Sequence, residues 1–436
     1  MNRREFLGGA LAAGGFWAVP GAVAAASPVR LRFGVVSDVH VREGGPRDHS
    51  TGGDTWYFSK ALRYFKDRKV DAVLIAGDIA DAGRDSEMES VAKAWFEVFP
   101  EGCGVEKLFV SGNHDWSGQK TIEKMSALWE TAWHEPYVSL WHKTVKGYHF
   151  VGKHWDSNGF VGLAAWLKEN GEPLKGGRPF FYVQHPHPRG TCNGEWAWGR
   201  DGGATTKALQ DWPNAVTFSG HSHLPLTDGR CVWRGGFTSI SASSLSYVCM
   251  PDGKKRRNAP DYRTNLDCRH GMVVDAYDDR LVIERRDFVH DEPLGDDLVF
   301  AMPTRGSTFE VRAFSREELP AFPRKAGVSA AVEGDALVVR FLGAFENPTA
   351  RPYEYRVSVE YVLADGGKGS LESRWFQSDA CFSRTRAAKA ENVVTVPLAE
   401  LPEGAVQARV RLTPMNCYGG AGKDTVSDSV RFKSRI

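Results

Sequence analysis

Short apolar runs alternate with segments of helical spacing over the first third of the chain. Leu31–Asp38 alternates, then turns apolar and ends on a carboxylate, which predicts a buried strand with Asp38 at its tip. Tyr57–Lys69 has helical spacing, and Val70–Ala76, a short apolar run rich in β-branched residues, predicts a second strand. The pattern repeats with a helix through Glu87–Phe99 and a strand at Lys107–Val110. This order predicts right-handed crossovers and a mostly parallel sheet.

The middle of the chain continues with one further helix and several strands. We expect the helix at Ile122–Trp133 and strands at Gly147–Lys153, Phe180–Gln184, Val216–Ser219 and Gly236–Ser241. Gly271–Ala276 and Arg280–Asp287 have the pattern of a hairpin, which would close a second sheet. We therefore interpret residues 27–302 as one α/β domain.

From about Thr308 the pattern changes to short alternating strands with almost no helical periodicity. Pro303, Gly306, Pro320 and Pro323 mark a linker zone. Seven strands are expected, at Thr308–Arg312, Val328–Val332, Ala336–Leu342, Tyr355–Val362, Asn392–Val396, Val406–Thr413 and Ser427–Lys433. Seven short strands in this layout predict a β-sandwich, so residues 303–436 are expected to form a small all-β domain with its linker.

The first 26 residues have the pattern of an export signal. Arg3-Arg4-Glu5-Phe6-Leu7 precedes a weakly apolar run, Gly8–Val19, that closes on small residues around Ala22–Ala26. A helix from Phe6 to Val19 would reach roughly 21 Å, short of the ~30 Å hydrocarbon core, so we expect cleavage and no transmembrane span in the mature chain. The paired arginines resemble a twin-arginine signal, which predicts a periplasmic or extracellular bacterial protein. An ordinary secretory signal and an uncleaved anchor stay open.

Composition narrows the class of partner. The chain has 436 residues with Lys+Arg 55 and Asp+Glu 54, and removal of the first 26 residues leaves 53 of each. A neutral chain without a long basic run argues against nucleic acid or an anionic membrane as the main partner. With 42% hydrophobic and 25% charged residues the composition excludes disorder, collagen and coiled coil. The seven cysteines have no C-x-x-C spacing, which argues against a structural zinc cluster.

Groups that bind metals stand at five predicted strand ends. In chain order they are Asp38-Val39-His40, Gly77-Asp78, Gly112-Asn113-His114-Asp115, His185 and Gly220-His221-Ser222-His223. Each string alone is a weak signal. Together they would gather carboxylate, imidazole and carboxamide groups at one sheet edge, where ligands of parallel sheets bind. Hard carboxylates beside imidazoles suit zinc, manganese or iron better than calcium.

This ordered set resembles the calcineurin-like metallophosphoesterase superfamily, whose pattern is D-x-H, G-D, G-N-H-D/E, H and G-H-x-H. The resemblance covers roughly Leu31 to Val299. It implies a β-sandwich flanked by helices, an α-β-β-α arrangement, with two divalent transition metal ions (Mn, Fe or Zn) between the strand ends. One metal would be held by Asp38, His40, Asp78 and His223. The other would be held by Asp78, Asn113, His185 and His221, so that Asp78 bridges the two.

The same resemblance implies that the protein hydrolyses phosphoesters with a hydroxide bound by both metals. Coordination lowers the pKa of water from ~15.7 towards ~7. His114 is the expected general acid, and Asp115 would orient it and keep it protonated. The alternative for both residues is a turn beside Asn113. His187 would face either the substrate phosphate or solvent.

The role of three tryptophans near the motifs stays open. Trp116, Trp196 and Trp198 lie beside or between the motifs and would either contact the substrate or belong to the core.

Two differences from the sequence patterns of known subfamilies narrow the range of expected metal sites and substrates. Purple acid phosphatases have a tyrosine three residues after the G-D aspartate, where this chain has Asp81, so a charge-transfer ferric site is not expected. Protein Ser/Thr phosphatases have an arginine where this chain has Ala82, which argues against a phosphoprotein substrate. We therefore expect a small phosphorylated substrate, either a monoester or a diester.

Other functions stay open at this stage. The fold could serve only as the scaffold of a surface binding protein, or the enzyme could cleave a pyrophosphate bond. Val406–Gly422 resembles the last strands of a fibronectin type III or immunoglobulin-like module. Such a module could contact a glycan or a protein partner, or brace the catalytic domain.

Overall fold

The computed structural model describes residues 28–43, 54–119, 121–156, 159–175, 178–192, 195–199, 201–256, 259–265, 267–302, 317–324, 327–347, 350–371, 373–378 and 391–432. The predicted export signal at residues 1–26 and the predicted strand Thr308–Arg312 lie outside these residues.

The first sheet contains the three predicted parallel strands. Its order is β14-β13-β12-β1-β2-β3, and β15 also pairs with β13. β1, β2 and β3 run parallel, whereas β12 pairs with β1 in the antiparallel sense. The strands are β1 (Leu31–Val36), β2 (Ala72–Ala76), β3 (Glu106–Val110), β12 (His270–Ala276), β13 (Arg280–Asp287), β14 (Glu292–Pro293) and β15 (Leu298–Ala301).

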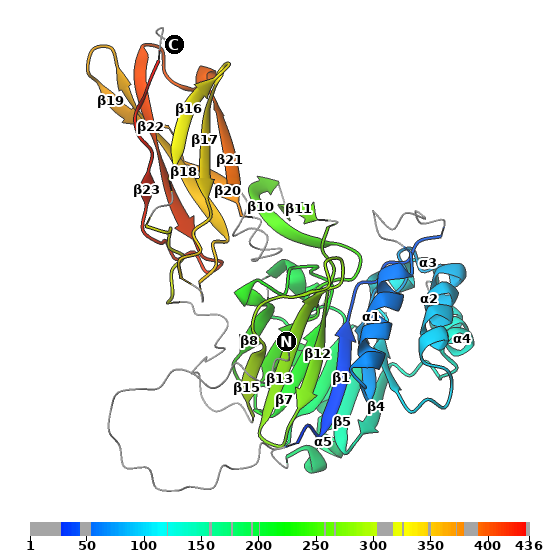
Figure 1. The fold of residues 1–436 in the computed structure, drawn as a ribbon. Coiled ribbons are helices and arrows are strands. Elements are labelled where there is room, and N and C mark those ends of the chain that lie inside the picture. Colours follow the sequence, from blue (N-terminus) through cyan, green and yellow to red (C-terminus); the bar gives the residue numbers. More distant parts are fainter. Residues whose placement is uncertain are drawn as a thin grey trace, which may run out of the picture.

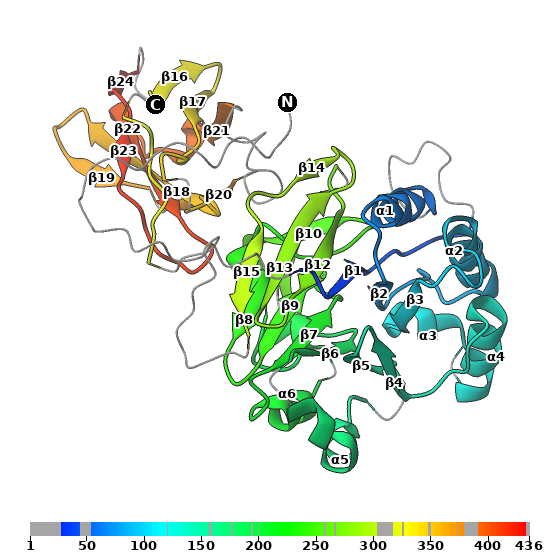
Figure 2. The ribbon, with the colours of Figure 1, turned by 60° about the horizontal axis from the view of Figure 1, so that its bottom comes forward.

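The second sheet lies face to face with the first (Figure 2). Its order is β4-β5-β6-β7-β9-β8, and β5, β6, β7 and β9 run parallel. The strands are β4 (Leu140–Val145), β5 (Tyr148–Lys153), β6 (Phe180–Gln184), β7 (Ala215–Ser219), β8 (Val232–Arg234) and β9 (Thr238–Ser241). β4 and β8, which the sequence pattern did not predict, are the antiparallel edges of this sheet.

Aromatic packing fixes the two sheets against each other. Phe33 of β1 makes edge-to-face contacts with Phe150, Phe181 and Phe218 of the second sheet, with ring centroids 5.3, 4.9 and 5.7 Å apart. All four side chains are fully buried. Such pairs add about 0.5–1.5 kcal/mol each beyond the burial of their apolar area.

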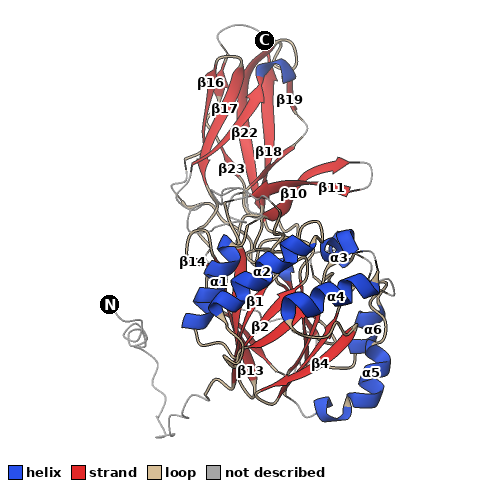
Figure 3. Cartoon of the chain, turned by 90° about the vertical axis from the view of Figure 1, so that its right-hand side faces the viewer, coloured by secondary structure: helices blue, strands red, loops and turns tan. Residues whose placement is uncertain are grey.

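Helices cover both outer faces and complete the predicted α-β-β-α arrangement (Figures 2 and 3). The apolar faces of α1 (Trp56–Asp67), α2 (Asp85–Val98) and α4 (Ile122–Trp133) pack on the first sheet. α5 (Leu163–Asn170) and α6 (Ala204–Leu209) pack on the second. α3 (Asn113–Gln119) begins within the third motif.

Beyond the second sheet, β10 (Val248–Arg256) and β11 (Ala259–Asn265) form a separate hairpin beside the C-terminal strands (Figures 1 and 3). The sequence pattern did not predict this hairpin.

The C-terminal residues form two further sheets, as predicted. One has the order β16-β17-β21, and the other has the order β19-β18-β22-β23, with β20 paired to β18 and β24 to β22. The strands are β16 (Ser329–Glu333), β17 (Ala336–Leu342), β18 (Glu354–Leu363), β19 (Lys368–Ser370), β20 (Arg374–Gln377), β21 (Glu391–Pro397), β22 (Ala405–Met415), β23 (Thr425–Val426) and β24 (Val430–Arg431). Buried residues of both sheets, including Leu337, Tyr355 and Val410, form their shared core.

Among the described residues, no helix combines the length and the apolar character that a membrane crossing needs.

Candidate metal centre

The predicted ligands all lie just beyond the carboxyl ends of strands. In the first sheet the chain leaves β1 at Asp38, β2 at Asp78 and β3 at Asn113. In the second sheet it leaves β6 at His185 and β7 at His221 and His223. Because the two sheets pack face to face, these loops meet at one edge of the sandwich, as the sequence predicted.

The backbone at this edge is unusual. Five ligand candidates have left-handed φ angles: 51° at Asp38, 48° at His40, 51° at Asp78, 66° at His221 and 52° at His223. Non-glycine residues rarely adopt this conformation, which costs of order 1–3 kcal/mol and persists only where the surroundings enforce it. The bends between the histidines are thus made by His221 and His223 themselves.

Gly220 contributes space rather than the conformational freedom expected of it. A Cβ atom on Gly220 would lie 1.9 Å from Oγ of Ser37 and 2.2 Å from Oδ2 of Asp38. The backbone amide of His221 donates to both Asp38 carboxylate oxygens, at 3.1 and 3.0 Å. Only a residue without a side chain permits this close approach.

Three overlapping groups of side chains have the spacing of metal ligands. In each group, one ligand atom from every residue lies within 4.8 Å of the others. The groups are Asp38, His40 and His223; His40, Asp78 and His114; and Asp78, His185 and His221. Asp78 belongs to two of them, as expected of a carboxylate that bridges two ions.

The first group is tightly packed and almost fully buried. Nε2 of His223 lies 2.9 Å from Oδ1 of Asp38, and Nε2 of His40 lies 3.7 Å from the same oxygen. The two Nε2 atoms are 3.1 Å apart. These three side chains can therefore offer their atoms to a single ion.

The second and third groups meet at Asp78. Oδ2 of Asp78 lies 3.0 Å from Nε2 of His185 and 3.7 Å from Nε2 of His40. Asn113 Oδ1 is buried and has no hydrogen-bond donor among the described residues. A buried acceptor of this kind normally has a partner, so its position fits a metal ligand.

The donor set fits divalent transition metals. It contains two carboxylates, four imidazoles and one carboxamide oxygen, the combination that zinc, manganese and iron accept. Six of the seven predicted ligands, all but Asn113, thus fall into groups with the spacing of metal ligands.

Electrostatics favour the ligand forms of several groups. Burial opposes the ionisation of Asp38 and Asp78, but nearby imidazoles outweigh it, and the pKa of each carboxyl lies well below its usual range. Burial, together with the nearby His185, lowers the pKa of His221 to about 4. Ionised carboxylates and a neutral imidazole are the forms that bind metals.

His40 and His185 respond in the opposite way. Burial alone would lower their pKa values, but hydrogen bonds to Asp38 and Asp81 raise the pKa of His40 to about 10. The charge of Asp78 and a hydrogen bond to it raise the pKa of His185 to about 9. A metal ion must therefore displace protons from these two side chains, so binding is expected to release protons.

In three of the candidate ligands, the ring nitrogen that lies away from the cluster also has a hydrogen-bond partner. Nδ1 of His185 lies 2.7 Å from the carbonyl oxygen of Ala76, and Nδ1 of His223 lies 3.1 Å from that of Tyr247. Because a carbonyl oxygen only accepts, Nδ1 is the donor in both contacts, and Nε2 is left for an ion. Nδ1 of His40 lies 3.0 Å from the Asp81 carboxylate.

His114 lies within the cluster, but the expected pairing with Asp115 is not found. Nδ1 of His114 lies 2.6 Å from the carbonyl oxygen of Asp81, and its ring is 4.6 Å from that of His40. The Asp115 carboxylate instead accepts from the backbone amides of Ala80 and Gly112, both at 2.7 Å. The carboxylate thus joins the loops after β2 and β3. It does not pair with His114 because these backbone amides donate to it instead. Burial, with the Asp78 charge, raises the pKa of Asp115 to about 7.

His187 is enclosed rather than turned to solvent. Its ring is fully buried, and Nε2 lies 3.1 Å from Oγ of Ser222, between the last two ligands. Burial lowers its pKa to about 3, so it is neutral. His187 thus lies beside the loop that carries His221 and His223. Its direct contact with a substrate phosphate stays a prediction.

Different aromatic residues approach the centre from those that the sequence suggested. Trp116 donates from Nε1 to the Tyr137 hydroxyl at 3.1 Å and packs on the helical core. Instead, the Trp155 ring lies 6.3 Å from that of His185 and 6.5 Å from that of His221. The Tyr247 ring lies 4.2 Å from that of His223. Neither residue belongs to a motif, so no local sequence signal could have found them.

The other two tryptophans, Trp196 and Trp198, are not assigned to the metal centre. Trp198 is half-buried, with the Arg189 guanidinium 5.9 Å from its ring centroid. The Trp196 side chain lies outside the part of the molecule that the structure describes.

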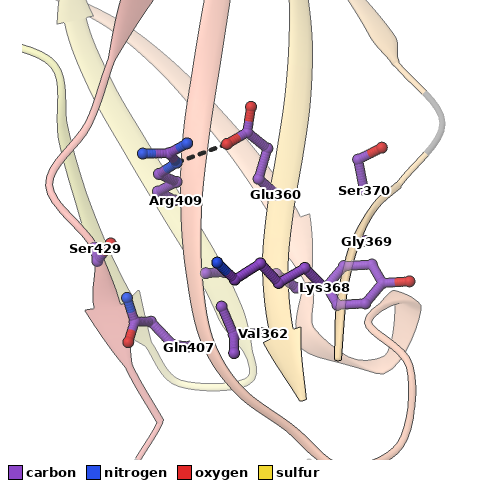
Figure 4. Close-up of a pocket in the computed structure, with 10 residues that line it drawn as sticks. Glu360, Val362, Lys368, Gly369, Ser370, Gln407, Arg409 and Ser429 are labelled. Carbon is purple, nitrogen blue, oxygen red and sulfur yellow. Dashed lines mark hydrogen bonds and ion pairs between the residues drawn. The ribbon is translucent and has the colours of Figure 1, made fainter. Parts of the chain in front are cut away.

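A separate pocket lies on the C-terminal sandwich (Figure 4). Its volume is about 520 Å³, and its lining includes Glu360, Lys368, Gln407 and Arg409 from β18, β19 and β22. Glu360 and Arg409 form an ion pair across the pocket at 2.6 Å.

Comparison with known families supports the domain resemblance. Residues 31–225 match the family model described as "Calcineurin-like phosphoesterase". No curated protein matches the chain.

Several solved structures are similar to part of this chain. A dimetal phosphatase from Danio rerio is 13% identical, with a TM-score of 0.40, and the match covers 63% of this chain and 99% of that chain. The purple acid phosphatase PPD1 from yellow lupin (Lupinus luteus) is 12% identical, with a TM-score of 0.42 and coverage of 65% and 57%. A predicted phosphoesterase from Streptococcus pneumoniae TIGR4 is 15% identical, with a TM-score of 0.30 and coverage of 62% and 97%.

Proposed function

This chain carries a calcineurin-like phosphoesterase domain at residues 31–225, and from that premise we propose that it is a dinuclear metal-dependent phosphoester hydrolase. The expected substrates are small phosphomonoesters or phosphodiesters. The observation that carries the proposal is the pair of ligand groups joined at Asp78, together with the buried Asn113 oxygen that has no hydrogen-bond donor among the described residues.

Each predicted ligand has a role in this proposal. One ion would be held by Asp38, His40, Asp78 and His223, and the other by Asp78, Asn113, His185 and His221. When bound, two such ions would lower the pKa of a water molecule and offset negative charge on the phosphoryl oxygens.

His114 is the proposed proton donor to the leaving oxygen. Its Nδ1 donates to the Asp81 carbonyl oxygen, which only accepts, so Nε2 is the nitrogen available to a substrate. Asp81 therefore takes the orienting role that the sequence assigned to Asp115.

The test is metal content and hydrolysis of aryl phosphate monoesters and diesters by the mature protein. We expect about two Mn, Fe or Zn ions per chain and metal-dependent turnover. Asp78→Ala should lose both ions and at least about 10³-fold in activity, because it removes the shared ligand. Asp211→Asn, at an exposed position, is the matched control and should change neither.

The result also separates the remaining alternatives. A protein that binds no transition metal and hydrolyses nothing with added manganese, iron or zinc would support the scaffold function. Faster cleavage of a nucleotide sugar or another pyrophosphate than of any ester would identify a pyrophosphate hydrolase.

We further propose export through the twin-arginine-like segment at residues 1–26. Its support is the sequence pattern Arg3-Arg4-Glu5-Phe6-Leu7 followed by an apolar run and small residues. Replacement of both arginines by lysine should block translocation in a bacterial host. Unchanged translocation would contradict the twin-arginine route.

The C-terminal sandwich is the proposed place for contact with a glycan or protein. Its pocket offers carboxylate, ammonium, amide and hydroxyl groups, as polar partners require (Figure 4). Loss of binding to a glycan array after Lys368→Ala and Gln407→Ala would support this role.

A further inference from the structure

The C-terminal sandwich packs on the segment that follows the last two metal ligands. The ring of Tyr353, which precedes β18, belongs to a small apolar cluster that crosses between the two domains. Its partners from the catalytic domain are Leu224, Val248, Met250 and Cys268, and Cys417 packs against the cluster from the sandwich. Tyr353 is only 8% exposed, so this contact is closed to water.

Polar contacts reinforce the same junction. The Arg230 guanidinium lies 4.7 Å from the centroid of the Tyr353 ring and pairs with the Asp228 carboxylate at 2.6 Å. Nη1 of Arg351 donates to the carbonyl oxygen of Thr227 at 3.3 Å. Residues 224–230, which directly follow His223, are therefore held from the sandwich side by Arg351 and Tyr353.

The backbone at the start of β10 holds His223. The backbone amide of Cys249 donates to the carbonyl oxygen of His223 at 2.9 Å. Nδ1 of the His223 ring donates to the carbonyl oxygen of Tyr247. Val248 and Met250, on either side of Cys249 in β10, face the Tyr353 cluster. The first residues of β10 thus contact the sandwich with their side chains and His223 with their backbone.

The other group of ligands is anchored within the catalytic domain. His185 is held by the Ala76 carbonyl oxygen at the end of β2, at 2.7 Å. The backbone amide of His221 is held by the Asp38 carboxylate. These contacts do not pass through the sandwich.

We propose that Tyr353 of the C-terminal domain is a positioning residue for His223, so that the sandwich sets the affinity of the ion held by Asp38, His40 and His223. The proposal rests on the proposed function, because it assumes two bound ions. The sandwich would then be part of the metal site's support and not only an appended module.

The test is titration of the metal-free full chain with Zn²⁺ and, separately, Mn²⁺, with calorimetry and metal analysis as readouts. Tyr353→Ala should weaken one of the two binding events by about 10-fold or more and leave the other within about twofold, a size typical for loss of outer support. Tyr353→Phe, which keeps the ring, should bind both ions like the wild type. Tyr361→Ala is the matched control, since Tyr361 is partly buried against the sandwich's own core.

Arg351→Ala provides a second variant in case Tyr353→Ala does not fold, because it removes the long hydrogen bonds from Arg351 to the carbonyl oxygens of Thr227 and Leu294. It should weaken the same binding event by a few-fold. Three results would overturn the inference: an equal loss of affinity for both ions, an equal loss of affinity in Tyr361→Ala, or no loss of affinity in either interface variant. If the wild type still binds two ions and is fully active, the proposed function stands in each of these cases. A wild-type chain that binds fewer than two ions would overturn it together with the proposed function.

Discussion

The carboxylate of Asp81 lies 3.0 Å from Nδ1 of His40, and this contact orients a predicted metal ligand from a residue 41 positions away. The other carboxylate oxygen of Asp81 accepts from Nε of Arg42, also at 3.0 Å. Because Nδ1 of His40 is engaged, Nε2 is the nitrogen that faces Asp38 and Asp78. A carboxylate behind a histidine in this way fixes its tautomer and raises its basicity.

Asp81→Asn should therefore weaken metal binding without unfolding the protein. We expect about 10–100-fold lower affinity, because the amide no longer stabilises the ligand histidine as a carboxylate does. Metal titration of the variant measures the change. Arg42→Ala is the control, since it removes a half-exposed ion pair but keeps the Asp81 carboxylate, and it should have a much smaller effect. Equal effects of the two variants would show that the Asp81–His40 contact is unimportant.

His114→Asn should distinguish substrates by their leaving group. If His114 protonates the leaving oxygen, its loss should cost about 10²–10⁴-fold in kcat for alkyl phosphates and much less for nitrophenyl phosphates, which leave without protonation. Steady-state kinetics on both substrate types measures the difference. A uniform loss across leaving groups would instead assign His114 to binding.

The strand ends were predictable, whereas the contacts behind them were not. β1, β2 and β3 are short apolar runs ending on a carboxylate or carboxamide motif, so the sequence alone indicates where Asp38, Asp78 and Asn113 lie. The partner of His114 depends instead on local backbone geometry. The sequence suggested Asp115, but the free amides of Ala80 and Gly112 take that carboxylate.

Missed strands have the same kind of explanation. β4 (Leu140–Val145) is an edge strand with polar and apolar residues mixed, so it has no clear alternation. β10 contains Pro251, Asp252 and Gly253, which are turn signals in the sequence, yet it pairs with β11 across an irregularity in register. Tyr247, which precedes β10 and whose ring contacts that of His223, could not be assigned to the site for that reason.

The stability of the protein should fall below about pH 6.5 because of His154. This ring is buried against Tyr137, and its Nδ1 accepts from the amide of Ser111 at 3.0 Å. Burial, with the nearby Lys153 and Lys143, holds its pKa well below the usual range. The unfolded chain therefore binds a proton below about pH 6.5 that the folded protein does not, so the free energy of unfolding decreases as the pH falls.

His154→Gln should reduce this dependence, since an amide oxygen can still accept from Ser111 but does not titrate. Between pH 6.5 and 5 the free energy of unfolding of the wild type should fall more steeply than that of the variant, by up to about 1.4 kcal/mol per pH unit. Denaturant titrations at several pH values measure both slopes. Parallel slopes would mean that His154 is protonated in the folded protein as well.

Gly220→Ala should damage the centre although the change adds one methyl group. The new Cβ would lie 1.9 Å from Oγ of Ser37 and 2.2 Å from Oδ2 of Asp38, so the loop after β7 must move away from β1. We expect about 1–3 kcal/mol lower stability and loss of ordered metal binding, because His221 and His223 follow directly. Gly202→Ala is the matched control, since a Cβ there meets nothing within 4 Å, and it should leave both unchanged. Thermal melting with and without Zn²⁺ tests the pair: a Gly220→Ala protein that is stabilised by zinc as much as Gly202→Ala would contradict the close approach of these two loops.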